Sequence, residues 1–323
     1  MGDEYSMADD EKRNLRMGHY KKSGREGESS QGMGSYRDVA ERMKEVARQQ
    51  SMATSNMMKI RYKIVIMSSK GGVGKSLVTS SLSAAIASMG RSVGVLDADF
   101  HGPSIHKMLG VPTGYGMLAR IDGTVDPVVT SIGVKIASIG LLIPKDDVAL
   151  IWRGPIKASA IRELLAYVNW GPLDYILVDL PPGTGDESLT IVQSIPRVSG
   201  LILVTIPSEV SKSVVKKAIA FASKLKTPII GIIENMSYYR CPHGEVIHIF
   251  GKGVAEDLAR EYNIPFLGAI PLDPRIRECN DEGKIFFLEY PDSEAAVVFR
   301  EIAKRVIDIV ENGKAVIPEI RED

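Results

Sequence analysis

Short apolar runs alternate with longer segments of helical period, and this alternation constrains the fold most. The runs are rich in Val, Ile and Leu, which is typical of parallel strands buried on both faces. They lie at 62–67, 92–97, 134–139, 175–180, 200–206, 229–235 and 266–270. The helical segments lie at 75–89, 155–169, 187–195, 210–225, 251–262 and 292–311. The pattern predicts a doubly wound α/β domain, with a mostly parallel sheet and helices on both faces.

The first 57 residues have a different texture. Apart from methionines, their only large aliphatic residues are Leu15, Val39 and Val46. Burial of so little apolar surface cannot offset the entropy that the chain loses on folding. Residues 1–57 are therefore expected to be a largely disordered extension. Helical spacing of Val39, Met43 and Val46 predicts one short helix near 36–50. The α/β domain is expected over 58–313, followed by a short tail over 314–323.

Charge and cysteine content narrow the class of protein. Lys plus Arg equals Asp plus Glu, at 40 each, which argues against a dedicated nucleic-acid or anionic-membrane surface. Two cysteines make no disulfide framework, and no apolar run is long enough to span a bilayer. We therefore expect a cytoplasmic protein with no nucleic-acid or membrane partner.

A glycine-rich loop stands between the first apolar run and the first helical segment, in the string SSKGGVGKS. Gly71, Gly72 and Gly74 allow a tight curl whose N–H groups point at phosphate oxygens. Lys75 is placed to neutralise the β- and γ-phosphates, and the Ser76 hydroxyl to bind Mg²⁺. The strand–loop–helix context predicts a nucleotide-binding P-loop.

One departure from the usual G-x-x-x-x-G-K-[ST] pattern is informative. Ser69 stands where the first glycine is expected, and Lys70 follows it, so the loop carries a second lysine besides Lys75. Either this lysine is a solvated loop residue, or it adds a second cation for the charge that builds up during phosphoryl transfer.

Acidic and amide side chains follow three later strands. Asp97 and Asp99 come at the end of one strand and Asp179 at the end of another, where ligands bind in open α/β sheets. A Pro-Pro-Gly-Thr-Gly segment follows Asp179 and is suited to a switch loop. Asn235 can give and accept hydrogen bonds at a purine edge, and no guanine signature is present, so ATP is favoured.

These residues make up the predicted nucleotide site. The cofactors are ATP and Mg²⁺, with ATP hydrolysis as the expected activity. Residues expected to contact the nucleotide are Ser69, Lys70, Gly71, Gly72, Val73, Gly74, Lys75, Ser76, Leu77 and Asn235. Residues expected to act in catalysis are Lys70, Lys75 and Asp99. Residues expected to face Mg²⁺ are Ser76, Asp97 and Asp179.

The K-G-G-x-G-K-S loop resembles that of the MinD/ParA/nitrogenase-iron-protein class. Strings such as DADFHGPS, WRGP, LVDLPPGTGDE, ENMSYYRCP and GAIPLDPR resemble the Mrp/ApbC iron–sulfur cluster carrier ATPases. This resemblance covers about residues 60–310. It implies a homodimer that closes over two ATP molecules, with Lys70 reaching the partner's nucleotide. It also implies an iron–sulfur cluster at the dimer interface that is passed to apo iron–sulfur proteins.

The cysteine motif departs from the family pattern C-P-x-C. Cys241, Pro242 and His243 are followed by Gly244 where a second cysteine is expected. A dimer therefore offers two Cys241 thiolates, whereas a [4Fe–4S] cluster takes four. His243 can complete a Cys₂His₂ set for a cluster or zinc, Cys279 can approach, or the cluster is bound weakly or not at all.

The missing cysteine keeps a second function open, that of a MinD/ParA-like ATP-dependent switch protein without a cluster. The chain ends in PEIRED, which lacks the basic amphipathic helix that a membrane-binding switch requires. A third function, that of a small-molecule kinase, is disfavoured by the Lys70 loop.

Overall fold

The computed structural model describes residues 36–319 except 69, 101 and 142–153. By its contacts the chain divides into two compact units, Met1–Val46 and Ala47–Asp323. The fold described below is that of the second unit. Residues 1–35, which are expected to be disordered, and the P-loop residue Ser69 lie outside the described part.

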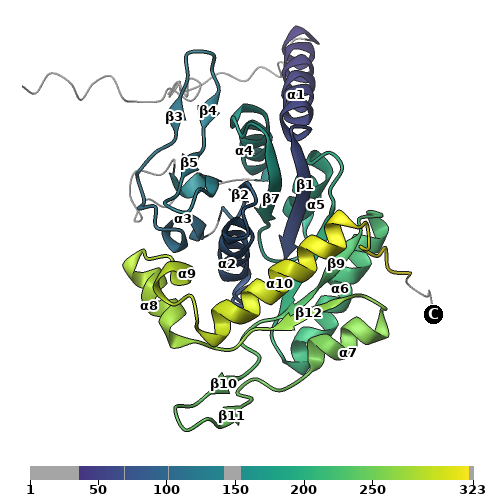
Figure 1. Cartoon of the computed structure of the whole chain (residues 1–323). Coiled ribbons are helices and arrows are strands. Elements are labelled where there is room, and N and C mark those ends of the chain that lie inside the picture. The colour runs from purple at the N-terminus through teal and green to yellow at the C-terminus, as the bar shows by residue number, and fades with distance from the viewer. Residues whose placement is uncertain (1–35, 69, 101, 142–153, 320–323) are drawn as a thin grey trace, which may run out of the picture. The chain divides into compact units, whose positions relative to one another are not determined.

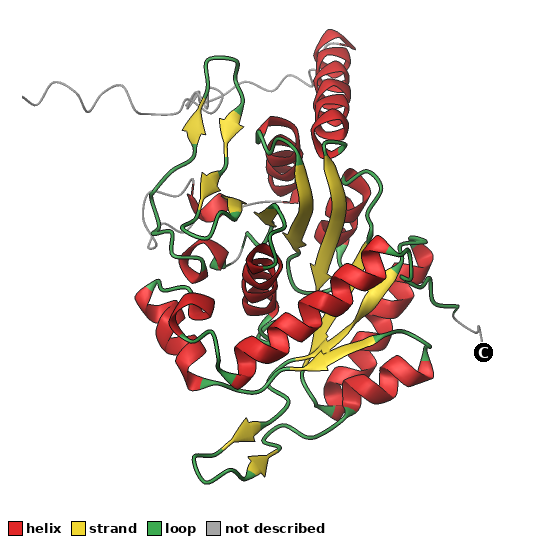
Figure 2. Cartoon of the chain, in the orientation of Figure 1, coloured by secondary structure: helices red, strands yellow, loops and turns green. Residues whose placement is uncertain are grey.

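The second unit alternates strands and helices along the chain, as Figure 2 shows by colour. The strands are β1 (Ile60–Met67), β2 (Val93–Asp97), β3 (Leu118–Ala119), β4 (Val125–Asp126), β5 (Val128–Val129), β6 (Lys135–Ser138), β7 (Leu173–Asp179), β8 (Gly200–Thr205), β9 (Ile229–Glu234), β10 (Tyr239–Arg240), β11 (Val246–Ile247) and β12 (Phe266–Ala269). The helices are α1 (Tyr36–Met57), α2 (Lys75–Ser88), α3 (Ile105–Met108), α4 (Gly154–Tyr167), α5 (Asp186–Ser194), α6 (Glu209–Lys224), α7 (Val254–Glu261), α8 (Pro274–Glu282), α9 (Phe286–Glu289) and α10 (Glu294–Glu311).

The core is one eight-stranded sheet in the order β12-β9-β8-β1-β7-β2-β6-β5. All neighbouring strands are parallel except β5, which runs antiparallel to β6. Figure 1 shows α2 and α10 in front of the sheet and α4, α5 and α6 behind it. Because β1 lies at the centre, between β7 and β8, the loop that follows it opens at the point where parallel α/β sheets bind ligands.

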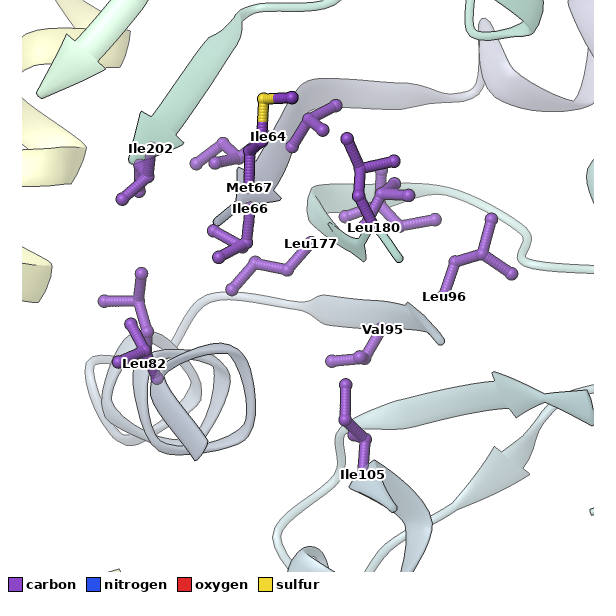
Figure 3. Packing of buried hydrophobic residues seen from close by; sticks show 14 of the residues in the cluster. Ile64, Ile66, Met67, Leu82, Val95, Leu96, Ile105, Leu177, Leu180 and Ile202 are labelled. Carbon is purple, nitrogen blue, oxygen red and sulfur yellow. The ribbon is translucent and has the colours of Figure 1, made fainter. Parts of the chain in front are cut away.

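The apolar runs form strands because helices cover both faces of the sheet. Every residue of β2, β8 and β9 is buried. Figure 3 shows Leu82 of α2 turned toward side chains of the central strands. Burial of each such side chain contributes about 1.5–3 kcal/mol. Packing of α2 against the sheet therefore fixes the position of the first residue of this helix, which directly follows the glycine loop.

The predicted fold class is confirmed, and all seven apolar runs are strands to within two residues at either end. The six helical segments expected beyond the P-loop are also present. The last helix begins as the sequence indicates, because the Ser293 hydroxyl accepts a hydrogen bond from the Ala296 N–H, 3.2 Å away.

The helix expected over 36–50 runs further, from Tyr36 to Met57. It continues because Ala53 and Met57 are buried in the core of the second unit. The sequence analysis did not anticipate α3, α8, α9 or the short strands β3, β4, β5, β10 and β11. Among the described residues, no helix has the length and apolar character that crossing a membrane requires.

Candidate nucleotide site and cysteine turn

The glycine loop connects β1 to α2 as the motif predicts. Gly72 and Gly74 both have φ near +80°, a conformation that side chains other than glycine rarely adopt. Gly74 caps α2, whose first residue is Lys75. The free N–H groups and positive end of this 14-residue helix therefore face the loop.

Lys75 and Asp179 form the centre of the site. The Lys75 ammonium donates to Asp179 Oδ2 at 2.5 Å, and both side chains are buried. Ser76 Oγ donates to the same oxygen at 2.7 Å, and Thr79 Oγ1 lies 2.5 Å from Asp179 Oδ1. The carboxylate thus holds the lysine and the serine hydroxyl of the motif in one charge-assisted network.

Asp97 and Asp99 are two further carboxyl groups near Lys75. Asp99 Oδ2 is 3.8 Å from the Lys75 ammonium, and Asp99 N–H donates to Asp97 Oδ1 at 3.2 Å. Burial, with the nearby Asp179 carboxylate, raises the pKa of Asp97 to about 7, although Lys75 and a hydrogen bond from Ser138 oppose the shift. The Lys75 ammonium therefore lies near three carboxyl groups. The excess of acidic groups favours binding of a second cation together with ATP.

The segment after β7 touches the P-loop strand directly. Leu180 N–H donates to Ile66 O at 3.1 Å, and Gly183 N–H donates to Ser68 O at 2.8 Å. Gly183 has φ +96°, and its carbonyl accepts from Ser188 Oγ of α5 at 2.9 Å. A shift of the P-loop backbone would therefore be passed to the start of α5 through the hydrogen bonds that Gly183 makes with Ser68 and Ser188. Such a link is expected for a switch segment.

Asn235, at the end of β9, packs against the P-loop. Its side-chain amide donates to Val73 O at 2.9 Å, and its backbone N–H donates to Thr205 O at 2.7 Å. A Cβ on Gly74 would collide with the Asn235 amide, so Gly74 is needed for close approach as well as for its backbone angle. In this structure Asn235 holds the loop, and its contact with a purine stays a prediction.

The donor atoms of this site can be compared with those that Mg²⁺ prefers. Ser76 and Asp179 present oxygen donors 2.7 Å apart, which suits a hard cation. Within the described residues, no group of three His, Cys, Asp or Glu side chains can hold a metal. This is consistent with Mg²⁺, because that ion usually takes one or two protein ligands and completes its shell with phosphate oxygens and water.

The remaining P-loop residues are placed as follows. Lys70, Gly71 and Gly72 are exposed to solvent, whereas Val73 is buried and Leu77 packs against the core. The loop thus carries one exposed lysine, Lys70, and one buried lysine, Lys75, that is paired with Asp179.

Cys241 lies in a tight turn between β10 and β11. Gly244 N–H donates to Cys241 O at 2.9 Å, which closes a four-residue turn with Pro242 and His243 at its centre. Gly244 has φ +88°, as expected for the glycine that lets the turn rejoin β11. The shortened motif C-P-H-G is therefore a complete hairpin turn that presents one cysteine and one histidine, both at least partly exposed.

The other cysteine of the chain lies in another element, whereas His248 directly follows β11 of the same hairpin. Cys279 is buried in α8, and burial raises the pKa of its thiol, so it behaves as a core residue. His248 Nδ1 lies 3.2 Å from Ser237 O, and since a carbonyl only accepts, Nδ1 carries the proton.

Sequence reasoning missed three contributors to these sites. Thr79 was detectable, since it lies four residues after Lys75 and so shares a helix face with it. Ser138, which donates to Asp97 Oδ2 at 3.0 Å, comes from a different strand and left no local signal. Arg240, whose guanidinium is paired with Glu294, also had no local sequence signal.

Comparison with known proteins agrees with this geometry. The family model described as "NUBPL iron-transfer P-loop NTPase" matches residues 59–307. An "Iron-sulfur cluster carrier protein" of Saccharolobus solfataricus is 51% identical over 259 residues, which are 80% of this chain and 87% of the relative. A protein of the same name from Methanocaldococcus jannaschii is 52% identical over 270 residues, or 83% of this chain and 92% of the relative.

Solved structures share the fold. A nucleotide-binding protein from Archaeoglobus fulgidus, in complex with ADP, is 40% identical with a TM-score of 0.65, covering 73% of this chain and 92% of that one. MinD from Pyrococcus horikoshii, complexed with Mg-ADP, is 28% identical with a TM-score of 0.56, covering 76% and 96%. The family model spans most of the chain, and the two iron-sulfur cluster carrier proteins are identical to it at about half of the aligned residues. This chain therefore belongs to the family of iron-transfer P-loop NTPases.

Proposed function

We propose that this chain is an ATP-hydrolysing homodimer that binds an iron–sulfur cluster through Cys241 and passes it to apo-proteins in the cytoplasm. The observation that carries the proposal is the short path between the two sites. Asn235 donates to the P-loop carbonyl of Val73, and Cys241 follows six residues later on the same segment. The nucleotide loop and the cysteine turn are thus linked by one short, hydrogen-bonded stretch of chain.

In the hydrolytic step, water attacks the γ-phosphorus and the bond to the β–γ bridging oxygen breaks, giving ADP and phosphate. Lys75 and the N–H groups of the loop stabilise the charge that develops on the phosphoryl oxygens. Mg²⁺ held beside Ser76 and Asp179 would neutralise the β- and γ-oxygens. Asp99, 3.8 Å from Lys75, is close enough to orient the attacking water.

A dimer is needed for two reasons. Lys70 is exposed beside the loop, so the cation it contributes is available to a second protomer's nucleotide. The turn contributes one cysteine from each chain, so the cluster we propose at Cys241 takes ligands from two chains. Two Cys241 thiolates and two His243 imidazoles would complete such a set.

The test is anaerobic reconstitution with iron and sulfide, followed by iron analysis and visible absorption. Wild-type protein should gain an iron–sulfide charge-transfer band and run as a dimer with ATP. Cys241→Ala should lose the band, whereas Cys279→Ala, which removes the buried cysteine, is the matched control and should keep it. A wild-type protein that stays colourless would overturn the carrier function.

A second function is favoured by the single cysteine of the turn. If the wild type binds no iron but still dimerises with ATP and hydrolyses it, the chain is a MinD/ParA-like switch without a cluster. His243→Ala separates the cluster geometries, because a Cys₂His₂ site loses stability and shifts its absorption in this variant, whereas a site built on thiolates alone does not.

A further inference from the structure

The hairpin that carries Cys241 has little packing of its own. Every residue from Pro242 to Lys252 is exposed, including Val246, Ile247 and Phe250. Its two strands pair over only two residues each, Tyr239 with Ile247 and Arg240 with Val246. Since isolated two-stranded hairpins are marginally stable in water, the position of this one depends on contacts at its base.

At that base, one carboxylate collects three donors. Arg240 Nε and Nη2 donate to the two oxygens of Glu294 at 2.9 Å each, in a bidentate pair. The Tyr238 hydroxyl donates to Glu294 Oε1 at 2.9 Å. The hydrogen bond from Arg240 lowers the pKa of Glu294, and burial with the Glu294 contact raises the pKa of Tyr238 to about 12. At neutral pH Glu294 is therefore ionised and Tyr238 is protonated, the forms that accept and donate these bonds.

Glu294 is itself held firmly by the domain. It is the first residue of α10, directly after the capping residue Ser293. Ala295, Ala296 and Phe299 of the following turns are buried in the core. Helix α10 packs against α2, the helix that begins at the P-loop, and the two lie next to each other in Figure 1. Glu294 therefore ties the hairpin to α10, the helix that packs against the element carrying Lys75.

We propose that Glu294 is a positioning residue for the Cys241 turn, holding it through Tyr238 and Arg240 at a fixed place relative to the nucleotide domain. Cys241 is the residue directly after Arg240, so the bidentate pair fixes the backbone from which the thiol projects. The inference deepens the proposed carrier function, since it concerns the site at which that function places a cluster. It stands apart from nucleotide chemistry, because none of the three side chains touches the P-loop network described above.

The first test measures the alkylation rate of Cys241 with iodoacetamide, read by mass spectrometry on the intact full chain. Cys279, buried in α8, serves as the internal reference for global unfolding. Glu294→Gln should raise the Cys241 rate by about tenfold, the change in local opening that loss of one charge-assisted hydrogen bond produces. Glu301→Gln, on the same helix and in an exposed pair with Lys304, is the control and should leave the rate unchanged.

Rescue separates positioning from general stability. Arg240→Glu and Glu294→Arg should each raise the rate, and the double variant, which restores an opposite-charge pair, should lower it again. Iron uptake on reconstitution should fall in the single variants and recover in the double one. Mg·ADP affinity of every variant is measured as the check on the nucleotide domain.

The outcomes are distinguishable. A Glu294→Gln protein with the same Cys241 rate and iron uptake as Glu301→Gln overturns the positioning role. Wild-type protein that takes up no iron overturns the carrier function instead, and the alkylation rates then still decide the role of Glu294. A Cys279 rate that rises with that of Cys241 would mean that the variant has unfolded globally, and would also count against a local role.

Discussion

The Lys75 ammonium lies 2.5 Å from Asp179 Oδ2, and both side chains are buried. The motif predicts that the lysine binds phosphates and that the acid faces the metal, yet here each is the partner of the other. Phosphates would offer Lys75 a new set of negative charges, and Mg²⁺ would offer Asp179 a new positive charge.

Lys75→Ala should weaken the empty protein as well as abolish nucleotide binding. It leaves Asp179 buried with only hydroxyl partners, at a cost of about 3 kcal/mol in the free energy of unfolding. Urea unfolding with EDTA present measures this, and titration with a fluorescent ADP analogue measures affinity. Lys75→Met combined with Asp179→Leu should recover most of the stability without recovering affinity. Full stability in Lys75→Ala would mean that the pair contributes nothing to the fold.

Lys70→Ala should separate binding from turnover. The Lys70 side chain is exposed, so its loss should change nucleotide affinity little. If it supplies a cation to the partner's nucleotide, kcat should fall by about 10³-fold, at the lower end of the range for an arginine finger. ATP-dependent dimerisation, followed by light scattering, should weaken in parallel. Equal losses in affinity and in kcat would contradict a role across the dimer.

The sheet was predictable because its strands are continuous apolar runs covered on both faces, a pattern that is visible without any partner. The hairpins at 118–126 and 239–247 were not, because strands of two residues have no periodicity to detect. The last turns of α1 were also missed. Ala53 and Met57 look unremarkable in sequence, and only the core they enter makes them helical.

The nucleotide site was likewise predictable from the sequence only in part. The loop motif identifies Lys75 and Ser76 by themselves, because the spacing carries the chemistry. It does not predict that Asp179, 104 residues from Lys75, is that lysine's partner in the empty state. Nor does it predict the bond from Asn235 to Val73, since contacts over such separations depend on strand register and helix packing.

Gly74→Ala should damage the site more than Gly72→Ala does. Both glycines have φ near +80°, so each substitution strains the backbone at a cost of about 1 kcal/mol. A Cβ at Gly72 meets nothing within 4 Å, whereas at Gly74 it collides with the Asn235 amide. Thermal unfolding and ADP affinity should therefore fall further in Gly74→Ala. Equal effects in the two variants would mean that the Asn235 contact does not matter.

Asp97 should make the stability of the empty protein depend on pH. Its pKa is raised to about 7 from 3.8, so the folded chain binds more protons than the unfolded chain between these values. The free energy of unfolding in EDTA should therefore fall as the pH rises from about 4 to 7, by a few kcal/mol at most. Urea unfolding at a series of pH values measures this change.

Asp97→Asn tests the assignment, because its amide keeps the shape of the carboxyl group but cannot ionise. This variant should lose the pH dependence and be more stable than wild type above pH 7 without ligand. Asp174, on the same sheet but nearly at the surface with its pKa lowered by hydrogen bonds from Ser92, makes the matched control. Asp174→Asn should lose stability above pH 4, the opposite sign. If Asp97→Asn is less stable than wild type at pH 8, the Asp97 carboxylate must be ionised and favourably paired with Lys75 in the empty site.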